Sequence, residues 1–225
     1  MLMTQQILII GLGQFGMTLA RTLAQKGAEV LAIDSQKSRV EEAAAFVTEA
    51  VAIDARDEIS LARLEPRKRD VSICAIGSAA KESSILCTAL LRQMGAPLVI
   101  ARANDPVHRR ILQLVGAHDI INPEEEFGKR FANRIMYRTI IADTNLGDDL
   151  QLTEIHTLPW MAGKTLIELG LPKHFGVMVA GIRPNGKGNI IQPIPGQPLN
   201  PDDSLIIVSN ETAMSQLIQA KKAKP

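Results

Sequence analysis

Apolar and polar positions along the first half of the chain follow two different periods. Short runs rich in Ile, Val and Ala are separated by longer segments in which apolar residues recur every three or four positions. The first pattern is typical of buried strands and the second of amphipathic helices. Six runs fit strands, at residues 7–10, 30–33, 50–53, 71–75, 98–101 and 119–121.

The segments between these runs carry helix signals. Phe15, Leu19 and Leu23 share one helical face, and Gly27 supplies a helix stop. A later helix is indicated by Asp105 as N-cap with Pro106 at the first helical position. Strands joined by right-handed helical crossovers predict an α/β fold, a Rossmann-like doubly wound parallel sheet with strand order 3-2-1-4-5-6.

The pattern changes after the sixth strand. Residues 122–143 are predicted as one long helix that covers the sheet edge or crosses to a second subunit, with an apolar stripe of Phe127, Phe131, Ile135 and Met136. The polar segment 143–149 is predicted as a boundary between domains 1–144 and 149–225. The second domain reads as a small α+β unit with strands at 152–157, 177–182, 189–194 and 205–208, a hairpin turn at 183–189, and helices at 165–169 and after 211.

Composition limits the classes of function. The chain has 25 basic and 24 acidic side chains, a net charge of +1, so no overall field favours nucleic acid. Cys74 and Cys87 lie in apolar segments without metal or disulfide spacing, which predicts buried thiols in a reducing compartment. Because no signal peptide or apolar run long enough to span a bilayer is visible, we expect a soluble cytoplasmic protein that meets a membrane only through a partner.

A glycine motif lies between the first strand and its helix. Gly11, Gly13 and Gly16 form G-x-G-x-x-G, which provides a tight turn, close approach of phosphates and close helix packing. Asp34 ends the second strand, where a carboxylate accepts hydrogen bonds from a ribose; its alternative role is a helix N-cap. A 2′-phosphate would be repelled there, so NADP is disfavoured.

Further residues follow the other strands at the same edge of the sheet. Asp54 is placed beside the adenine, and Ile76 and Gly77 lie beside the glycine loop. Arg102 either reaches a phosphate or is a surface charge. The full set predicted to contact the nucleotide is Gly11, Gly13, Gln14, Phe15, Gly16, Asp34, Ser35, Asp54, Ala55, Ile76, Gly77 and Arg102.

No reaction centre is visible beside this predicted site. His156 and His174 lack an obvious carboxylate partner, and His108 and His118 lack metal spacing. The "GKT" at 163–165 is not a P-loop, because Leu158 stands where that motif requires glycine. We therefore predict a protein that is not an enzyme.

Several segments together resemble a known family. The stretches "ILIIGLGQFGMTLARTLAQKGAEVLAID", "VSICAIGS" and "VGAHDIINPE" resemble the RCK (or KTN) N-lobe of TrkA/KtrA-type potassium-uptake regulators. The later "GKTLIEL" and "DSLIIV" resemble the RCK C-lobe, so the likeness covers about residues 6 to 218. It implies a nucleotide-sensing gating subunit that forms homodimers, assembled into an octameric ring, beneath an integral-membrane potassium channel or transporter.

The resemblance also implies ligands. ATP, ADP, NAD or NADH would bind the N-lobe; Glu124 would hold a divalent cation between subunits; and the C-lobe would bind cyclic di-AMP near 174–182 and 192–197. Gln14 stands where many ATP-responsive members have Arg, which puts a preference for ATP over ADP in doubt. Asn122, in place of a family histidine, weakens the cation site.

Two alternatives stay open at this point. Beside the potassium-transport regulator, they are an NAD-dependent oxidoreductase whose second domain supplies a substrate site, and an RCK regulator of a different cation channel or exchanger. The absence of catalytic groups in the sequence argues against the oxidoreductase. Only the identity of the membrane partner would distinguish a regulator of another channel or exchanger from a regulator of a potassium transporter.

Overall fold

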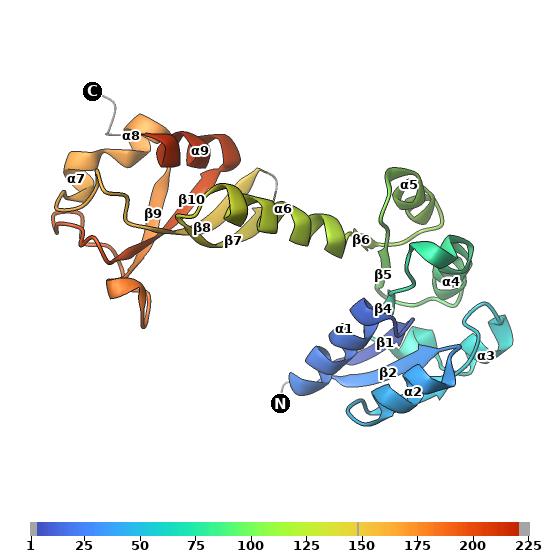
Figure 1. Cartoon of the computed structure of the whole chain (residues 1–225). Helices are drawn as coiled ribbons and strands as arrows, with labels where there is room; N and C mark the ends of the chain where they lie inside the picture. The colour runs from blue at the N-terminus through green and yellow to red at the C-terminus, as the bar shows by residue number, and fades with distance from the viewer. Residues whose placement is uncertain (1–3, 148, 221–225) are drawn as a thin grey trace. The chain divides into compact units, whose positions relative to one another are not determined.

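The computed structural model describes residues 4–147 and 149–220. The chain divides into two compact units, one ending at Glu125 and the other beginning at Glu126. Among the described residues, no helix has the length and apolarity needed to cross a membrane. Each unit is described separately below, with elements labelled as in Figure 1.

The first unit is a six-stranded parallel sheet in the order β3-β2-β1-β4-β5-β6, which confirms the predicted topology. Its strands are β1 (Gln6–Ile10), β2 (Glu29–Asp34), β3 (Glu49–Ala52), β4 (Val71–Cys74), β5 (Val99–Arg102) and β6 (Asp119–Ile121). Its helices are α1 (Gln14–Gln25), α2 (Lys37–Ala44), α3 (Glu58–Ala62), α4 (Lys81–Gln93) and α5 (Pro106–Leu114), with short 3-10 turns at Pro66–Lys68 and Ser78–Ala80.

Two apolar cores cover the two faces of this sheet. Successive strand residues point to opposite faces, so Ile7 and Ile9 of β1 pack with α1 and α2, whereas Leu8 and Ile10 pack with α4 and α5. This double burial explains why the strands read as continuous apolar runs. All the strands therefore present their carboxyl ends at one edge, where ligands bind in folds of this kind.

The second unit contains an antiparallel sheet in the order β7-β8-β10-β9 (Figure 1). The strands are β7 (Ile140–Gly147), β8 (Leu150–His156), β9 (Met178–Arg183) and β10 (Ser204–Asn210). Helices α7 (Leu166–Leu169), α8 (Leu171–Phe175) and α9 (Glu211–Gln219) accompany it, and a 3-10 turn follows β9 at Pro184–Gly186. The long helix α6 (Pro123–Met136) begins at the end of the first unit and runs into the second.

The predicted helix over 122–143 is too long. The α6 helix ends at Met136, and Ile140–Gly147 instead forms β7, which pairs with β8. The β-branched run Thr139, Ile140 and Ile141 favours a strand, and Ile140 is buried in the core of the second unit. Residues 143–147 of the predicted polar boundary consequently belong to β7.

The strand predicted at 189–194 is also absent from the structure. Only Ile191 pairs, exchanging backbone hydrogen bonds with Ile182 at 2.8 and 3.0 Å. Pro193 and Pro195 have no backbone N–H to donate, so a regular ladder cannot continue through them. The turn predicted at 183–189 is present as a 3-10 turn that leads to this single bridge.

Candidate functional site

The glycine loop joins β1 to α1 at the carboxyl edge of the parallel sheet. Gly11 has a φ of +94°, a left-handed conformation that favours glycine, and its N–H donates to Ile33 O at 2.8 Å. Gly13 is the N-cap of α1 and makes no side-chain cap. The free N–H groups of the first helical turn, together with the positive end of the helix dipole, therefore suit an anion.

Gly16 has a packing role rather than a ligand-binding one. A Cβ at this position would lie 1.9 Å from the carbonyl oxygen of Gly11, far inside van der Waals contact. The absence of a side chain lets α1 approach the glycine loop closely. Gly16 is buried and does not line the cavity described next.

A cavity of about 480 Å³ opens beside the glycine loop. Nine of the twelve residues predicted to contact a nucleotide line it: Gly11, Gly13, Asp34, Ser35, Asp54, Ala55, Ile76, Gly77 and Arg102. The strands β1, β2 and β5 and the loops after β3 and β4 all contribute to its wall. Residues distant in sequence thus meet at the edge that the strand pattern predicted.

Asp34 is buried at the end of β2, with 8% of its surface exposed. Its carboxylate accepts hydrogen bonds from the backbone N–H of Leu12 at 2.7 Å and of Gln36 at 2.8 Å. Arg39 approaches the same carboxylate at 3.4 Å. Asp34 therefore fixes the glycine loop to β2, and since a carboxylate offers about four acceptor positions, one remains for a ribose hydroxyl.

Asp54 lines the cavity from the loop after β3 but is strongly paired. Arg56 contacts both of its carboxylate oxygens, with the Nη2 to Oδ2 distance at 2.6 Å. This guanidinium holds the pKa of Asp54 below its usual value. Arg56 also lines the cavity, so this side of the site presents an ion pair rather than an isolated carboxylate.

Arg102 is the last residue of β5 and lines the cavity, and its side chain is 14% exposed. Its guanidinium lies over the Phe15 ring, 5.4 Å from the centroid, and forms an ion pair with Glu124. Burial lowers the pKa of Arg102, but a guanidinium stays charged in proteins. Its Nε is buried without a hydrogen-bond partner in the described structure.

Gln14 and Phe15 do not line this cavity. Gln14 is exposed at the start of α1 and lines a neighbouring hollow with Thr18, Arg21 and Arg39. Phe15 is half-buried, and its ring packs against the guanidinium of Arg102. Within one chain, therefore, neither side chain is in the wall where a nucleotide would lie.

Several lining residues were missed by the sequence analysis, notably Gln36, Arg39, Arg56 and Ser83. A signal for two of them existed, because Arg39 and Arg56 each follow an aspartate shortly after the carboxyl end of a strand. The cavity therefore carries three arginines, from α2, from the loop after β3 and from β5, where one was predicted.

Groups suited to proton transfer do not line the cavity in the part of the chain that the structure describes. Its titratable residues are two paired aspartates and three arginines. His108 is buried in α5, and His118 is held by the N–H of Val99 at 2.8 Å and by Arg92 at 2.7 Å. The described lining therefore suits an anionic ligand, and both of its carboxylates are already paired.

Glu124 does not lie in a cation site within the chain. The side chain that faces it is the Arg102 guanidinium, and the described residues contain no group of three or more His, Cys, Asp or Glu that could hold a metal ion. Asn122 caps α6 instead, since its Oδ1 accepts from the N–H of Glu125 at 3.1 Å. These donors do not fit a cation held by one chain alone.

The predicted cyclic di-AMP region of the second unit is only partly accessible. Phe175 and Val177 are buried in the core, whereas Met178 and Ile194 are exposed. The second segment is held to α7, because the Ile167 N–H donates to Pro195 O at 3.2 Å. Binding of a second nucleotide there stays a prediction.

Comparison with known proteins identifies the family. The TrkA-N domain model matches residues 7–123, and the TrkA-C domain model matches residues 153–221. The chain belongs to the TrkA-N/TrkA-C family. It is 34% identical over 216 residues to the Ktr system potassium uptake protein A of Vibrio alginolyticus, covering 96% of this chain and 97% of that one. It is 31% identical over 214 residues to the Ktr system potassium uptake protein C of Bacillus subtilis, covering 95% and 96%.

Solved structures show the same fold for the TrkA-N/TrkA-C chain. The GsuK RCK domain aligns with 99% of this chain at a TM-score of 0.65 and 21% identity, and the GsuK channel bound to NAD at 0.67 and 22%. The chain spans 49% and 40% of the lengths of these two structures. These findings confirm the predicted RCK resemblance and fold class.

Proposed function

We propose that this protein is the cytosolic regulatory subunit of a Ktr- or Trk-type potassium transporter, and that it senses an adenine nucleotide without consuming it. One observation carries the proposal: the cavity combines a glycine loop, the buried carboxylate of Asp34 and three arginines, and no histidine, cysteine, lysine or tyrosine is among the described residues that line it. The relatives named as potassium uptake proteins support the transport role. The GsuK channel bound to NAD, which shares the fold, supports a dinucleotide as one candidate ligand.

ATP, ADP, NAD and NADH are all candidates under this proposal. A ligand can change transport only if it binds two states of the assembly with different affinity, a difference that is typically about 1–3 kcal/mol. Arginines at both ends of the cavity would supply this difference for ligands that differ in their phosphates. Homodimers assembled into a ring of eight beneath the membrane subunit are part of the proposal.

The test is calorimetric titration of the purified chain with ATP, ADP, AMP, NAD and NADH. We expect at least one to bind, and we expect Asp34→Asn to weaken binding at least tenfold because it removes the charge that accepts the ribose hydroxyls. Asparagine keeps an acceptor oxygen for one of the two backbone N–H groups that Asp34 holds, whereas alanine keeps none. Asp57→Asn is the matched control, because Asp57 caps α3 outside the cavity.

Two results would overturn the proposal. Steady loss of NADH with a small carbonyl substrate would make the chain an oxidoreductase. Equal affinities in Asp34→Asn and the wild type would remove Asp34 from the site. Potassium uptake in host cells that lack this chain should lose its dependence on the chosen nucleotide, whereas unchanged uptake would reject the transport role.

A further inference from the structure

One arginine serves two neighbouring features of the first unit. Arg102 lies in the wall of the cavity, and its Nη2 donates to the carboxylate of Glu124, in the first turn of α6. Glu124 itself does not line the cavity, and its side chain is 50% exposed. The cation nearest the glycine loop is therefore already engaged by an anion from outside the site.

The remaining donors of Arg102 point to a second acceptor. Its Nε is buried without a partner, and its Nη1 lies where a Cβ on Gly77 would come within 3.5 Å. Gly77 lines the cavity, so the guanidinium borders the space that a ligand would fill. A phosphate oxygen in that space would accept a charge-assisted hydrogen bond from Nη1.

We propose that Glu124 competes with nucleotide phosphates for Arg102 and so sets which nucleotides the cavity holds. Ligands whose phosphates reach Arg102 displace the Glu124 carboxylate, whereas adenosine leaves the ion pair intact. This inference rests on the proposed nucleotide site and assigns to Glu124 a role in specificity that needs no metal ion. Phosphate binding thereby also changes the contacts of the first turn of α6.

The magnitude follows from the exposure of the pair. The Glu124 side chain is 50% exposed, and ion pairs with a partner in water are weak. Loss of this pair should therefore change the affinity for ATP by about two- to fivefold. Screening by salt should reduce the effect further. The competition therefore tunes selection among nucleotides and does not block them.

The experiment measures ATP and adenosine affinity by calorimetry at low ionic strength with EDTA present. We expect Glu124→Gln to bind ATP about two- to fivefold more tightly than the wild type, with adenosine affinity unchanged. Glu126→Gln is the matched control, because it removes the same charge two positions along α6, where the described structure shows no ion pair with Arg102. Arg102→Gln should weaken ATP binding, and adding Glu124→Gln to it should change nothing further.

Each outcome decides the matter. Wild-type affinity for ATP in Glu124→Gln, or an equal gain in the Arg102→Gln background, would overturn this inference alone. In a parallel titration with Mg²⁺ in place of EDTA, a loss of ATP affinity in Glu124→Gln would assign Glu124 to a cation and overturn the inference. Failure of the wild-type chain to bind any nucleotide would overturn the proposed function together with the inference.

Discussion

Gly16 and Asp34 show how single residues shape the nucleotide loop. The Gly11 carbonyl oxygen lies where a Cβ on Gly16 would clash with it. The Asp34 carboxylate accepts a hydrogen bond from the Leu12 N–H and so holds the glycine loop. Both roles concern the backbone of the loop. The motif spacing predicted them as ligand contacts, whereas the structure shows that they first position the atoms that a ligand would meet.

Gly16→Ala should destabilise the first unit. The added methyl group would lie 1.9 Å from a backbone oxygen, and such overpacking typically costs about 1–3 kcal/mol. Gly128→Ala is the control, because Gly128 lies within α6 and a Cβ there meets nothing within 4 Å. Thermal unfolding should show a lower midpoint for Gly16→Ala and an equal or higher one for Gly128→Ala. Equal midpoints for Gly16→Ala and the wild type would refute the close approach.

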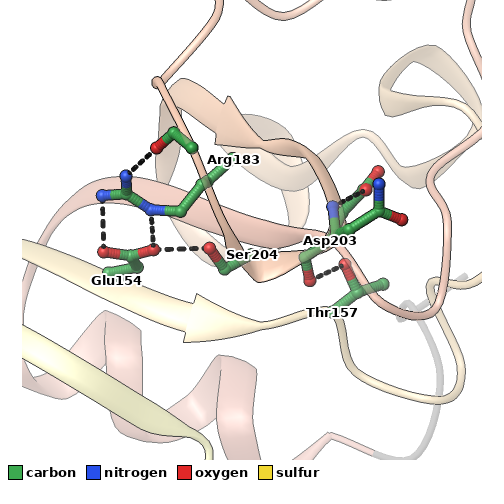
Figure 2. Close-up of polar contacts among 7 residues, drawn as sticks. Glu154, Thr157, Arg183, Asp203 and Ser204 are labelled. Carbon is green, nitrogen blue, oxygen red and sulfur yellow. Dashed lines mark hydrogen bonds and ion pairs between the residues drawn. The ribbon is translucent and has the colours of Figure 1, made fainter.

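At the scale of elements, a polar network joins three strands of the second unit. Figure 2 shows Glu154 of β8 between Arg183 of β9 and Ser204 of β10. Arg183 Nε donates to Glu154 Oε1 at 2.8 Å and Nη1 donates to Gly188 O at 2.5 Å, so the turn after β9 is also held. Asp203 accepts from the Asn185 N–H at 3.0 Å and anchors the same turn.

This network predicts a pH dependence of stability. Arg183 holds the pKa of Glu154 below its ordinary value of 4.5, so the ionised form is favoured in the folded state. The stabilisation is therefore fully present above about pH 4.5 and is lost as the pH falls through the lower folded-state pKa. At neutral pH the thermal unfolding midpoint of Glu154→Gln should be lower than that of the wild type. As the pH is lowered, the midpoint should fall less steeply in Glu154→Gln than in the wild type.

The control for this prediction is Glu168→Gln. Glu168 belongs to an exposed capping box with Thr165, away from the sheet network, and its pKa is also lowered. Its replacement should change the acid slope less than Glu154→Gln does. Parallel slopes for Glu154→Gln and the wild type would show that the ion pair does not contribute.

At the scale of the whole molecule, α6 carries an apolar stripe that the single chain leaves open. Phe127, Phe131, Ile135 and Met136 are 59%, 46%, 63% and 73% exposed. The two phenylalanine rings stack at 5.7 Å between centroids. An exposed apolar surface of this kind on a helix is typical of an interface between protein chains.

Phe131→Asp should therefore shift the chain toward the monomer. A charge in the middle of the stripe would have to be buried on association, which costs far more than leaving it in water. Ile59→Asp is the control, since Ile59 on α3 is 67% exposed and lies outside the stripe. Light scattering after size-exclusion chromatography gives the mass of each variant. If Phe131→Asp retains the mass of the wild type, the stripe is not the interface.

The sequence by itself determined the parallel sheet, its strand order and the position of the glycine loop. These features depend on local periods of apolar residues and on glycine spacing, both of which are visible in a linear chain. The structure after α6 depended on tertiary pairing: β7 pairs with β8, and Ile191 forms a single bridge to Ile182. Short β-branched segments after a helix have no local period that separates the two states.

Only the tertiary structure decided the charges of the site. Arg39 and Arg56 enter the cavity, Gln14 stays outside its wall, and Arg102 meets Glu124 across residues distant in sequence. Long side chains reach such partners through several rotatable bonds, so spacing along the chain does not fix where their charges lie. The sequence therefore located the edge at which a nucleotide would bind, and the folded chain determined which charged groups surround it.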